Sequence, residues 1–96
     1  MSRPRTVRFR LYVADQTPNS AQALANLTAI CEEHLTGRYA IEVVDVFHEP
    51  ARALKDGILM TPTLLTRPPL PDRKIVGTLS ETKFVVQTLG LEPAAA

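Results

Sequence analysis

The chain begins with a stretch in which apolar and polar positions alternate. Residues 7–14 read VRFRLYVA. The apolar positions are Val7, Phe9, Leu11 and Val13, and the positions between them are Arg8, Arg10 and Tyr12. A period of two places successive side chains on opposite faces of a β-strand. We therefore expect a strand over residues 7–14, with one buried face and with the arginines and Tyr12 on its outer face.

The pattern then changes to the spacing of a helix. Apolar residues recur every three or four positions, at Leu24, Leu27, Ile30, Cys31 and Leu35. This spacing indicates one buried helical stripe. Thr17 is a suitable N-cap and Pro18 a suitable first helical residue, where its missing N–H costs nothing. Gly37 is a plausible stop. In this stripe Cys31 is interpreted as a small core residue rather than a reactive thiol.

A second strand is expected over residues 40–47, which read AIEVVDVF. Its apolar positions are denser than strict alternation, which is typical of an interior strand covered on both faces. Strand, helix and strand together have the length of a βαβ unit. We therefore expect the two strands to be parallel, with a right-handed crossover.

The second half of the chain gives shorter and less regular signals. Residues 50–56 favour a short helix between Pro50 and Gly57, and residues 58–66 favour a strand that contains Pro62. The proline-rich residues 67–73 predict a loop, so residues 74–79 should complete a hairpin. Ser80 and Gly90 suit the two ends of a final helix. Its Phe84, Val85 and Val86 prefer strands, and helix is the interpretation we adopt.

The expected order, strand, helix, strand, helix, strand, strand, helix, is that of an α/β thioredoxin-like domain. Thr61, Pro62 and Thr63 fall where such proteins usually carry a cis-proline. With Pro18 as the anchor, Gln16 and Asn19 occupy the positions of the two redox thiols. Neither amide can become a nucleophilic thiolate or exchange disulfides. The pattern therefore predicts the geometry of a redox site without its chemistry.

Composition narrows the function further. The 96 residues suit one domain (1–96, with an ordered core over about 7–90), and a formal net charge of +1 argues against recruitment by nucleic acid or membrane. A lone cysteine and the lack of a signal-like or membrane-length apolar run favour a cytoplasmic protein. The clustered Arg3, Arg5, Arg8 and Arg10 fit either a solvent-facing strand end or a docking patch for an acidic partner.

Catalytic and metal-binding patterns are missing from the sequence. His34 and His48 have no further histidine or thiol at metal-ligand spacing, and His34 suits the end of a helix. No phosphate-binding or dinucleotide-binding glycine motif is present. We therefore expect no enzyme activity, no metal and no cofactor. The alternative is a redox-inactive thioredoxin-fold enzyme or small-ligand carrier, with a pocket near Pro62 and Thr17.

Four stretches resemble the KaiB family of circadian clock proteins. They are LYVADQTPNS followed by Ala23–Leu24, GRYAIEVVDV, LMTPTL and PPLPDRKIVGTLS. The resemblance implies a binding protein that recognises the ATPase ring of KaiC and sequesters KaiA. It also implies two arrangements. One is a homo-oligomer, dimer or tetramer, ordered βαββααβ, and the other is a thioredoxin-like βαβαββα form that binds KaiC.

The same resemblance suggests where partners bind. The expected partner-binding residues are Thr17, Pro18, Asn19, Ser20, Gln22, Thr61, Pro62, Thr63, Arg73, Lys74 and Gly77. Mixed strand and helix preference around Phe84 is compatible with residues 50–90 adopting both arrangements.

Several positions depart from the family pattern. Asp15 stands where the family usually has glycine, and Thr78 ends a stretch that usually reads IGD. Glu42 occupies an often basic position on a surface implicated in KaiA contact, and residues 93–96 replace an acidic tail. These departures weigh against KaiA as a partner. They suit a KaiB homologue outside the core oscillator, paired with a KaiC-like ATPase in stress adaptation.

Overall fold

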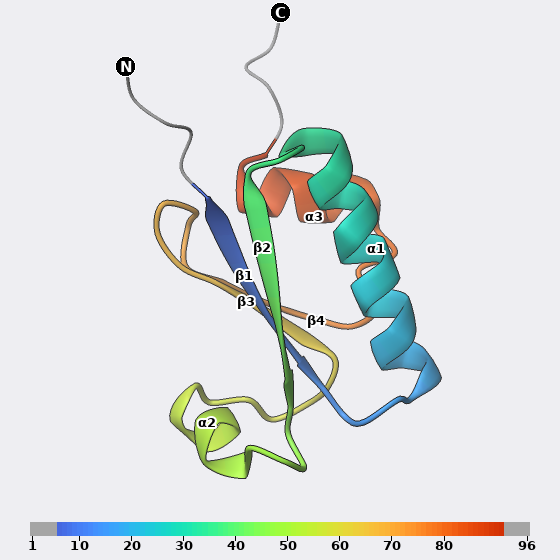
Figure 1. Cartoon of the computed structure of the whole chain (residues 1–96), viewed down its shortest axis with the longest axis vertical. Coiled ribbons are helices and arrows are strands. Elements are labelled where there is room, and N and C mark those ends of the chain that lie inside the picture. Colours follow the sequence, from blue (N-terminus) through green and yellow to red (C-terminus); the bar gives the residue numbers. More distant parts are fainter. Residues whose placement is uncertain (1–5, 92–96) are drawn as a thin grey trace, which may run out of the picture.

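The expected order of strands and helices is confirmed by the computed structural model, which describes residues 6–91 (Figure 1). The strands are β1 (Val7–Val13), β2 (Tyr39–Asp45), β3 (Thr63–Thr66) and β4 (Arg73–Val76). The helices are α1 (Pro18–His34), α2 (Pro50–Lys55) and α3 (Thr82–Leu89). The segment with mixed preference around Phe84 is thus helical here, as expected.

The four strands form one mixed sheet in the order β2-β1-β3-β4. β1 pairs with β2 in parallel, as predicted, and with β3 antiparallel, while β3 and β4 form the expected hairpin. The prediction that β2 is an interior strand is wrong, because β2 lies at the sheet edge. Its Val44 is buried but Val43 is 46% exposed. The dense valines therefore reflect β preference more than burial on two faces.

One face of the sheet, here called the α1 face, packs against α1 and α3 (Figure 1). The alternate apolar residues of β1, among them Phe9 and Leu11, meet the apolar stripe of α1, including Leu27 and Ile30. Val85, Val86 and Leu89 of α3 extend this core over β3 and β4. Burial of this continuous apolar surface is the main favourable contribution to folding of the unit.

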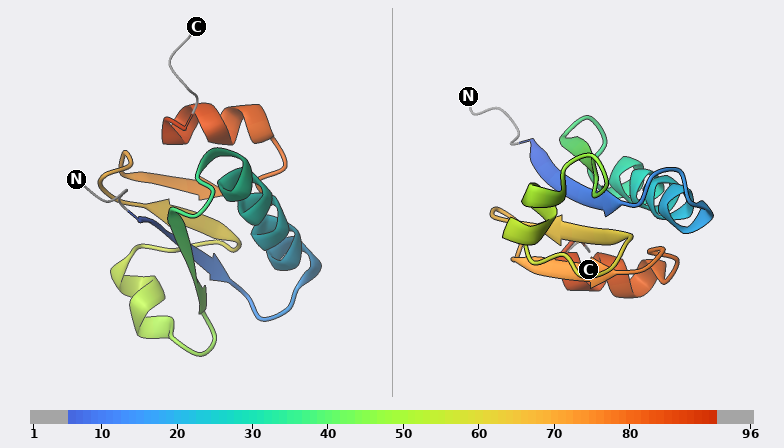
Figure 2. Two further views of the ribbon diagram at one scale, coloured as in Figure 1. Left: turned by 45° about the horizontal axis from the view of Figure 1, so that its top comes forward. Right: turned by 90° about the horizontal axis from the view of Figure 1, so that it is seen from below.

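The opposite face, here called the α2 face, carries a second and smaller core. α2 lies against this face (Figure 2). Tyr12, Val44 and Leu65 from three strands pack around its Ala53. Tyr12 is 0% exposed, so its predicted place on a solvent-facing side is wrong. The alternation was read correctly, but α2 covers the end of this face where Tyr12 lies. The other end, at Arg8, is not covered by α2.

A buried carboxylate joins α2 to the sheet. The Asp56 side chain, at the C-terminal end of α2, is 6% exposed. It accepts hydrogen bonds from Tyr12 Oη at 2.5 Å, from Arg10 Nη1 at 3.0 Å and from Arg67 Nη2 at 3.0 Å. These four residues are called the Asp56 cluster below. They connect α2, β1 and the start of the β3–β4 loop.

Element ends follow the sequence signals only in part. β2 ends at Asp45 instead of Phe47, and β4 ends at Val76 instead of Leu79. Thr17 caps α1, and Gly90 ends α3 in the left-handed conformation, both as predicted. The cap predicted at Ser80 is wrong, because α3 begins after Glu81 without a side-chain cap hydrogen bond. The strand predicted over 58–66 is reduced to β3, which starts one residue after Pro62. α1 ends at His34, three residues before the predicted stop at Gly37.

The Asp56 cluster predicts a specific loss of stability. Asp56→Asn keeps the size of the side chain but removes the charge that faces two guanidinium groups. Hydrogen bonds to charged groups contribute about 1.5–3 kcal/mol each, and Arg10 retains its second partner Glu42. We expect the free energy of unfolding, measured by urea denaturation at pH 7, to fall by about 2 kcal/mol. An unchanged value would show that the cluster contributes nothing.

The pH dependence of the same measurement has a defined sign. The hydrogen bond from Tyr12, together with the one from Arg10, lowers the pKa of Asp56. A lowered folded-state pKa stabilises the fold above the unfolded value of about 4, and this contribution is lost as the pH falls through the folded pKa. Stability of the wild type should therefore fall more steeply with acid than that of Asp56→Asn.

Candidate functional site

The loop between β1 and α1 is held by a small network of hydroxyl groups. Thr17 Oγ1 accepts a hydrogen bond from Ser20 N at 3.4 Å and donates one to Ser20 Oγ at 2.9 Å. Ser20 Oγ also accepts from Ala14 N at 3.2 Å. Ser20 is buried, whereas Thr17, Pro18 and Asn19 are exposed. The threonine-proline-asparagine-serine sequence thus fixes the helix start and presents three of its side chains to solvent.

Pairing across the sheet places this loop beside Pro62. Tyr12 on β1 is opposite Thr63 on β3, which is opposite Val76 on β4. One residue further along, Gly77 N donates to Pro62 O at 2.9 Å. The Thr61–Pro62 peptide bond is cis, as the sequence led us to expect. Here "the corner" means residues 17–20, residues 61–63 and Gly77, which all lie at this end of the sheet.

Not all of the expected partner-binding residues share the corner. Arg73 lies opposite Thr66 at the other end of β4, and Lys74 lies on the α2 face, where its Nζ donates to Gly57 O at 3.3 Å. Within the corner, Ser20, Pro62 and Thr63 are buried and hold the shape of the loop. Thr61 is half-buried. The fully exposed side chains are those of Thr17, Pro18, Asn19 and, one turn along α1, Gln22.

A surface that the sequence pattern did not predict lies next to the corner. Here "the apolar patch" means Phe47, Leu54, Leu59 and Met60, which are all more than half exposed, with Leu59 at 94%. They come from α2 and from the loops on either side of it. The run ILM was read as the start of a strand, which hid its exposure. The signal was Pro62, whose missing N–H prevents a long paired strand there.

The apolar patch and the corner emerge from the same end of the sheet. The loops after the parallel strands β1 and β2 leave at their carboxyl ends, and the antiparallel β3 starts there (Figure 1). Phe47 follows β2, whereas Leu59 and Met60 precede the cis-proline. Exposed apolar side chains grouped in this way are typical of a protein-binding surface.

The corner has no redox chemistry of its own. Gln16 and Asn19 are amides, and Cys31 is fully buried in the α1 stripe. Burial raises the pKa of the Cys31 thiol to about 12, so the thiolate is scarcely populated at neutral pH. Among residues 6–91 no group of three or more histidine, cysteine, aspartate or glutamate side chains could hold a metal ion. Over the same residues no helix is long and apolar enough to cross a membrane.

Comparison with known proteins identifies relatives over nearly the whole chain. The KaiB domain family model matches residues 10–91. The circadian clock oscillator protein KaiB of Synechococcus elongatus is 46% identical over 91 residues, which cover 95% of this chain and 89% of that protein. The circadian clock protein KaiB3 of a Synechocystis species is 39% identical over 85 residues, covering 88% of this chain and 83% of that protein.

Solved structures show the thioredoxin-like fold. The N-terminal domain of SasA from Synechococcus elongatus has a TM-score of 0.74 and 18% identity, covering 100% of this chain and 94% of that domain. Thioredoxin from Malassezia sympodialis has a TM-score of 0.67 and 16% identity, covering 90% of this chain and 76% of that one. At these identities the likeness concerns the fold alone.

The buried thiol predicts a lack of thioredoxin-type activity. At pH 8 a group with a pKa of about 12 is ionised in about one molecule in ten thousand. We expect no reduction of insulin above the dithiothreitol background. We also expect a thiol reagent such as Ellman's reagent to modify Cys31 only as fast as the protein unfolds, and at once in 6 M guanidinium chloride. Rapid modification of the native protein would contradict the buried position.

Proposed function

The chain belongs to the KaiB family, and from that premise we propose that it is a non-enzymatic regulatory protein that binds a KaiC-type ATPase. Its relatives are named circadian clock proteins, which supports a role in circadian or stress-related timing. We place this function in the cytoplasm, where a lone thiol stays reduced. The observation that carries the proposal is the apolar patch beside the corner, because a binding protein needs such a surface and an enzyme needs reactive groups that the corner lacks.

The surface proposed for the ATPase combines two kinds of side chain. The apolar patch supplies area that loses water on binding, which is the main source of affinity in protein interfaces. Thr17, Asn19 and Gln22 supply a polar rim. Gly77, the residue after β4, supports the corner through its hydrogen bond to Pro62, while Lys74 lies beside α2 on the other face. We therefore centre the surface on the patch and the corner and leave Arg73 outside it.

KaiA is left out of the proposed partners. Glu42 lies on β2, and its carboxylate accepts from Arg10 Nε at 2.9 Å and from Arg52 Nη2 at 2.8 Å. The hydrogen bond from Arg52, with that from Arg10, lowers the pKa of Glu42. The chain therefore has an ionised carboxylate at a position where clock members often have a basic side chain. A timing system of ATPase and KaiB homologue alone fits this difference.

A substitution in the apolar patch tests the proposed surface. Leu59→Glu should cost little stability, because the side chain is 94% exposed. It should weaken binding to a KaiC-type ATPase from the same source at least tenfold, since a carboxylate would have to lose its water in the interface. Phe84→Glu is the matched control, because Phe84 is also exposed but lies on α3. Its affinity should stay within twofold of wild type.

Native mass spectrometry and pull-down in the presence of nucleotide, over a range of temperatures, provide the measurement. A complex with the wild type and the Phe84→Glu variant, together with a weakened one for Leu59→Glu, supports the proposal. No complex under any of these conditions would overturn the function. Equal weakening by both substitutions would overturn the location of the surface.

We also propose that residues 50–90 adopt a second arrangement, in which the chain forms a dimer or tetramer. The Asp56 cluster bears on this equilibrium, since Asp56 and Arg67 belong to that segment whereas Arg10 and Tyr12 belong to β1. The cluster therefore stabilises the thioredoxin-like arrangement only. The mixed strand and helix preference of α3 supports a second packing of similar free energy.

This equilibrium predicts two sets of amide NMR signals that exchange slowly. Asp56→Asn should raise the share of the second set, because it weakens contacts made in one arrangement only. Analytical ultracentrifugation should show a matching increase in oligomer. Tyr39→Phe is the control, since its hydroxyl donates to Glu32 within the other half of the chain. One set of signals for all three proteins, at every temperature and concentration, would contradict the proposal.

A further inference from the structure

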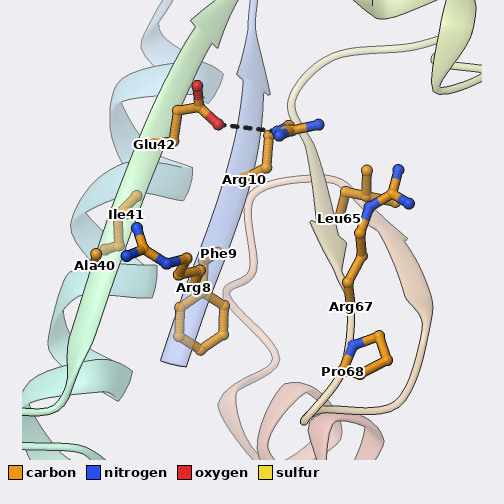
Figure 3. Close-up of a pocket in the computed structure, with 9 residues that line it drawn as sticks. All are labelled: Arg8, Phe9, Arg10, Ala40, Ile41, Glu42, Leu65, Arg67 and Pro68. Atoms are coloured by element: carbon orange, nitrogen blue, oxygen red, sulfur yellow. Dashed lines mark hydrogen bonds and ion pairs between the residues drawn. The ribbon is translucent and has the colours of Figure 1, made fainter. Parts of the chain in front are cut away.

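The uncovered end of the α2 face contains a hollow that neither the corner nor the apolar patch explains. Its volume is about 620 Å³, within the range of about 300–1,000 Å³ typical of small-molecule sites. Guanidinium groups come to it from two directions, Arg8 and Arg10 from β1 and Arg67 from the segment after β3 (Figure 3). Ala40, Leu65 and Pro68 contribute its apolar lining.

Most hydrogen-bond donors around this arginine hollow are unused. A guanidinium group has five N–H donors. Arg67 donates one hydrogen bond to Asp56. Arg10 donates one to Asp56 and one to Glu42. Among residues 6–91, no hydrogen bond or ion pair is found for the Arg8 guanidinium. Arg67 is also 61% exposed, so its remaining donors are accessible.

The charges of the hollow favour an anion. Three guanidinium groups face a single lining carboxylate, Glu42, and that carboxylate is already shared between Arg10 and Arg52. Asp56 lies behind Arg10 and Arg67 and holds both heads in place. Counting Asp56, the group retains a charge of +1 (three arginines less Glu42 and Asp56). Guanidinium groups oriented in advance bind phosphate or carboxylate with little further loss of side-chain freedom.

We propose that the arginine hollow binds a small organic anion, a phosphate or carboxylate group carried on an apolar body. Arg8 and the free donors of Arg67 contact the oxyanion, and the apolar body packs on Ala40, Leu65 and Pro68. The concave shape, with donors on β1 and on the segment after β3, favours a compact ligand over an extended acidic peptide. This site lies apart from the corner, where the sequence analysis had expected a small-ligand pocket.

NMR titration of the full chain tests the site with phenyl phosphate and with two reference probes, inorganic phosphate and phenol. Phenyl phosphate should give saturable amide shifts around Arg8, Ala40 and Leu65 and bind at least tenfold more tightly than either of the others. Benzoate distinguishes the two anion sources, because the tighter of benzoate and phenyl phosphate identifies the preferred head group. Affinity should fall as salt is added.

Two variants localise the binding. Arg8→Gln removes a guanidinium group that has no partner to disturb, and should weaken phenyl phosphate at least fivefold. Lys83→Gln is the control, because it removes one positive charge from α3 on the other side of the sheet and should change nothing. Ala40→Glu should abolish binding, since it puts a carboxylate opposite Arg8 in the register of the strands.

Three outcomes would overturn the inference. The first is no saturable shift with either organic anion. The second is equal weakening by Arg8→Gln and Lys83→Gln, which would indicate screening of overall charge rather than a site. The third is tighter binding of an acidic peptide to the same amides, which would assign the hollow to a macromolecular partner. The affinity for a KaiC-type ATPase is measured separately, so failure here is distinct from failure of the proposed function.

Discussion

The buried carboxylate of Asp56 is the contact on which the arrangement of the second half depends. α2 has six residues and buries only Ala53, so apolar contact alone fixes its position weakly. The hydrogen bonds from Tyr12, Arg10 and Arg67 supply what the small core does not. The pKa of Tyr12 is raised, mainly by burial and secondly by the hydrogen bond to Asp56. The contact is therefore weakened by alkali as well as by acid. Because its folded-state pKa is raised, Tyr12 stabilises the fold below its unfolded value of about 10 and loses that contribution as the pH rises further.

Structural features that depend on residues close in sequence could be predicted, whereas features that depend on contacts between distant segments could not. β1 and α1 were predicted well, because alternation, the Thr17 cap and the spacing of Leu27 and Ile30 act within a few residues. Tyr12 was misplaced because its burial depends on α2, which is distant in sequence and held by a charge contact. β2 was misplaced because valine-rich strands occur at edges and in interiors alike. No local pattern distinguishes these cases.

In the candidate site, too, features encoded by adjacent residues could be predicted and features that depend on tertiary contacts could not. The helix cap, the cis-proline and the missing thiols could be predicted, since each is encoded by a few adjacent residues. The apolar patch was missed, because Leu59 looks like a strand residue unless Pro62 is taken to delay the start of β3. The arginine hollow needed the structure most of all. Its Arg8 and Arg67 lie on opposite sides of the chain midpoint, and only sheet pairing brings them together.

The two proposed surfaces are connected through the Asp56 cluster. Asp56 ends the helix that carries Leu54 of the apolar patch, and the same carboxylate orients the Arg10 and Arg67 heads of the hollow. The proposed anion needs Arg67 beside Arg8, so it binds the thioredoxin-like arrangement and not one in which Arg67 has moved away. By linkage, such a ligand stabilises the arrangement that presents the apolar patch. The stabilisation is RT ln(1 + L/Kd), where L is the concentration of free ligand. The hollow would then adjust partner binding without contacting the partner, because both sites depend on one buried charge.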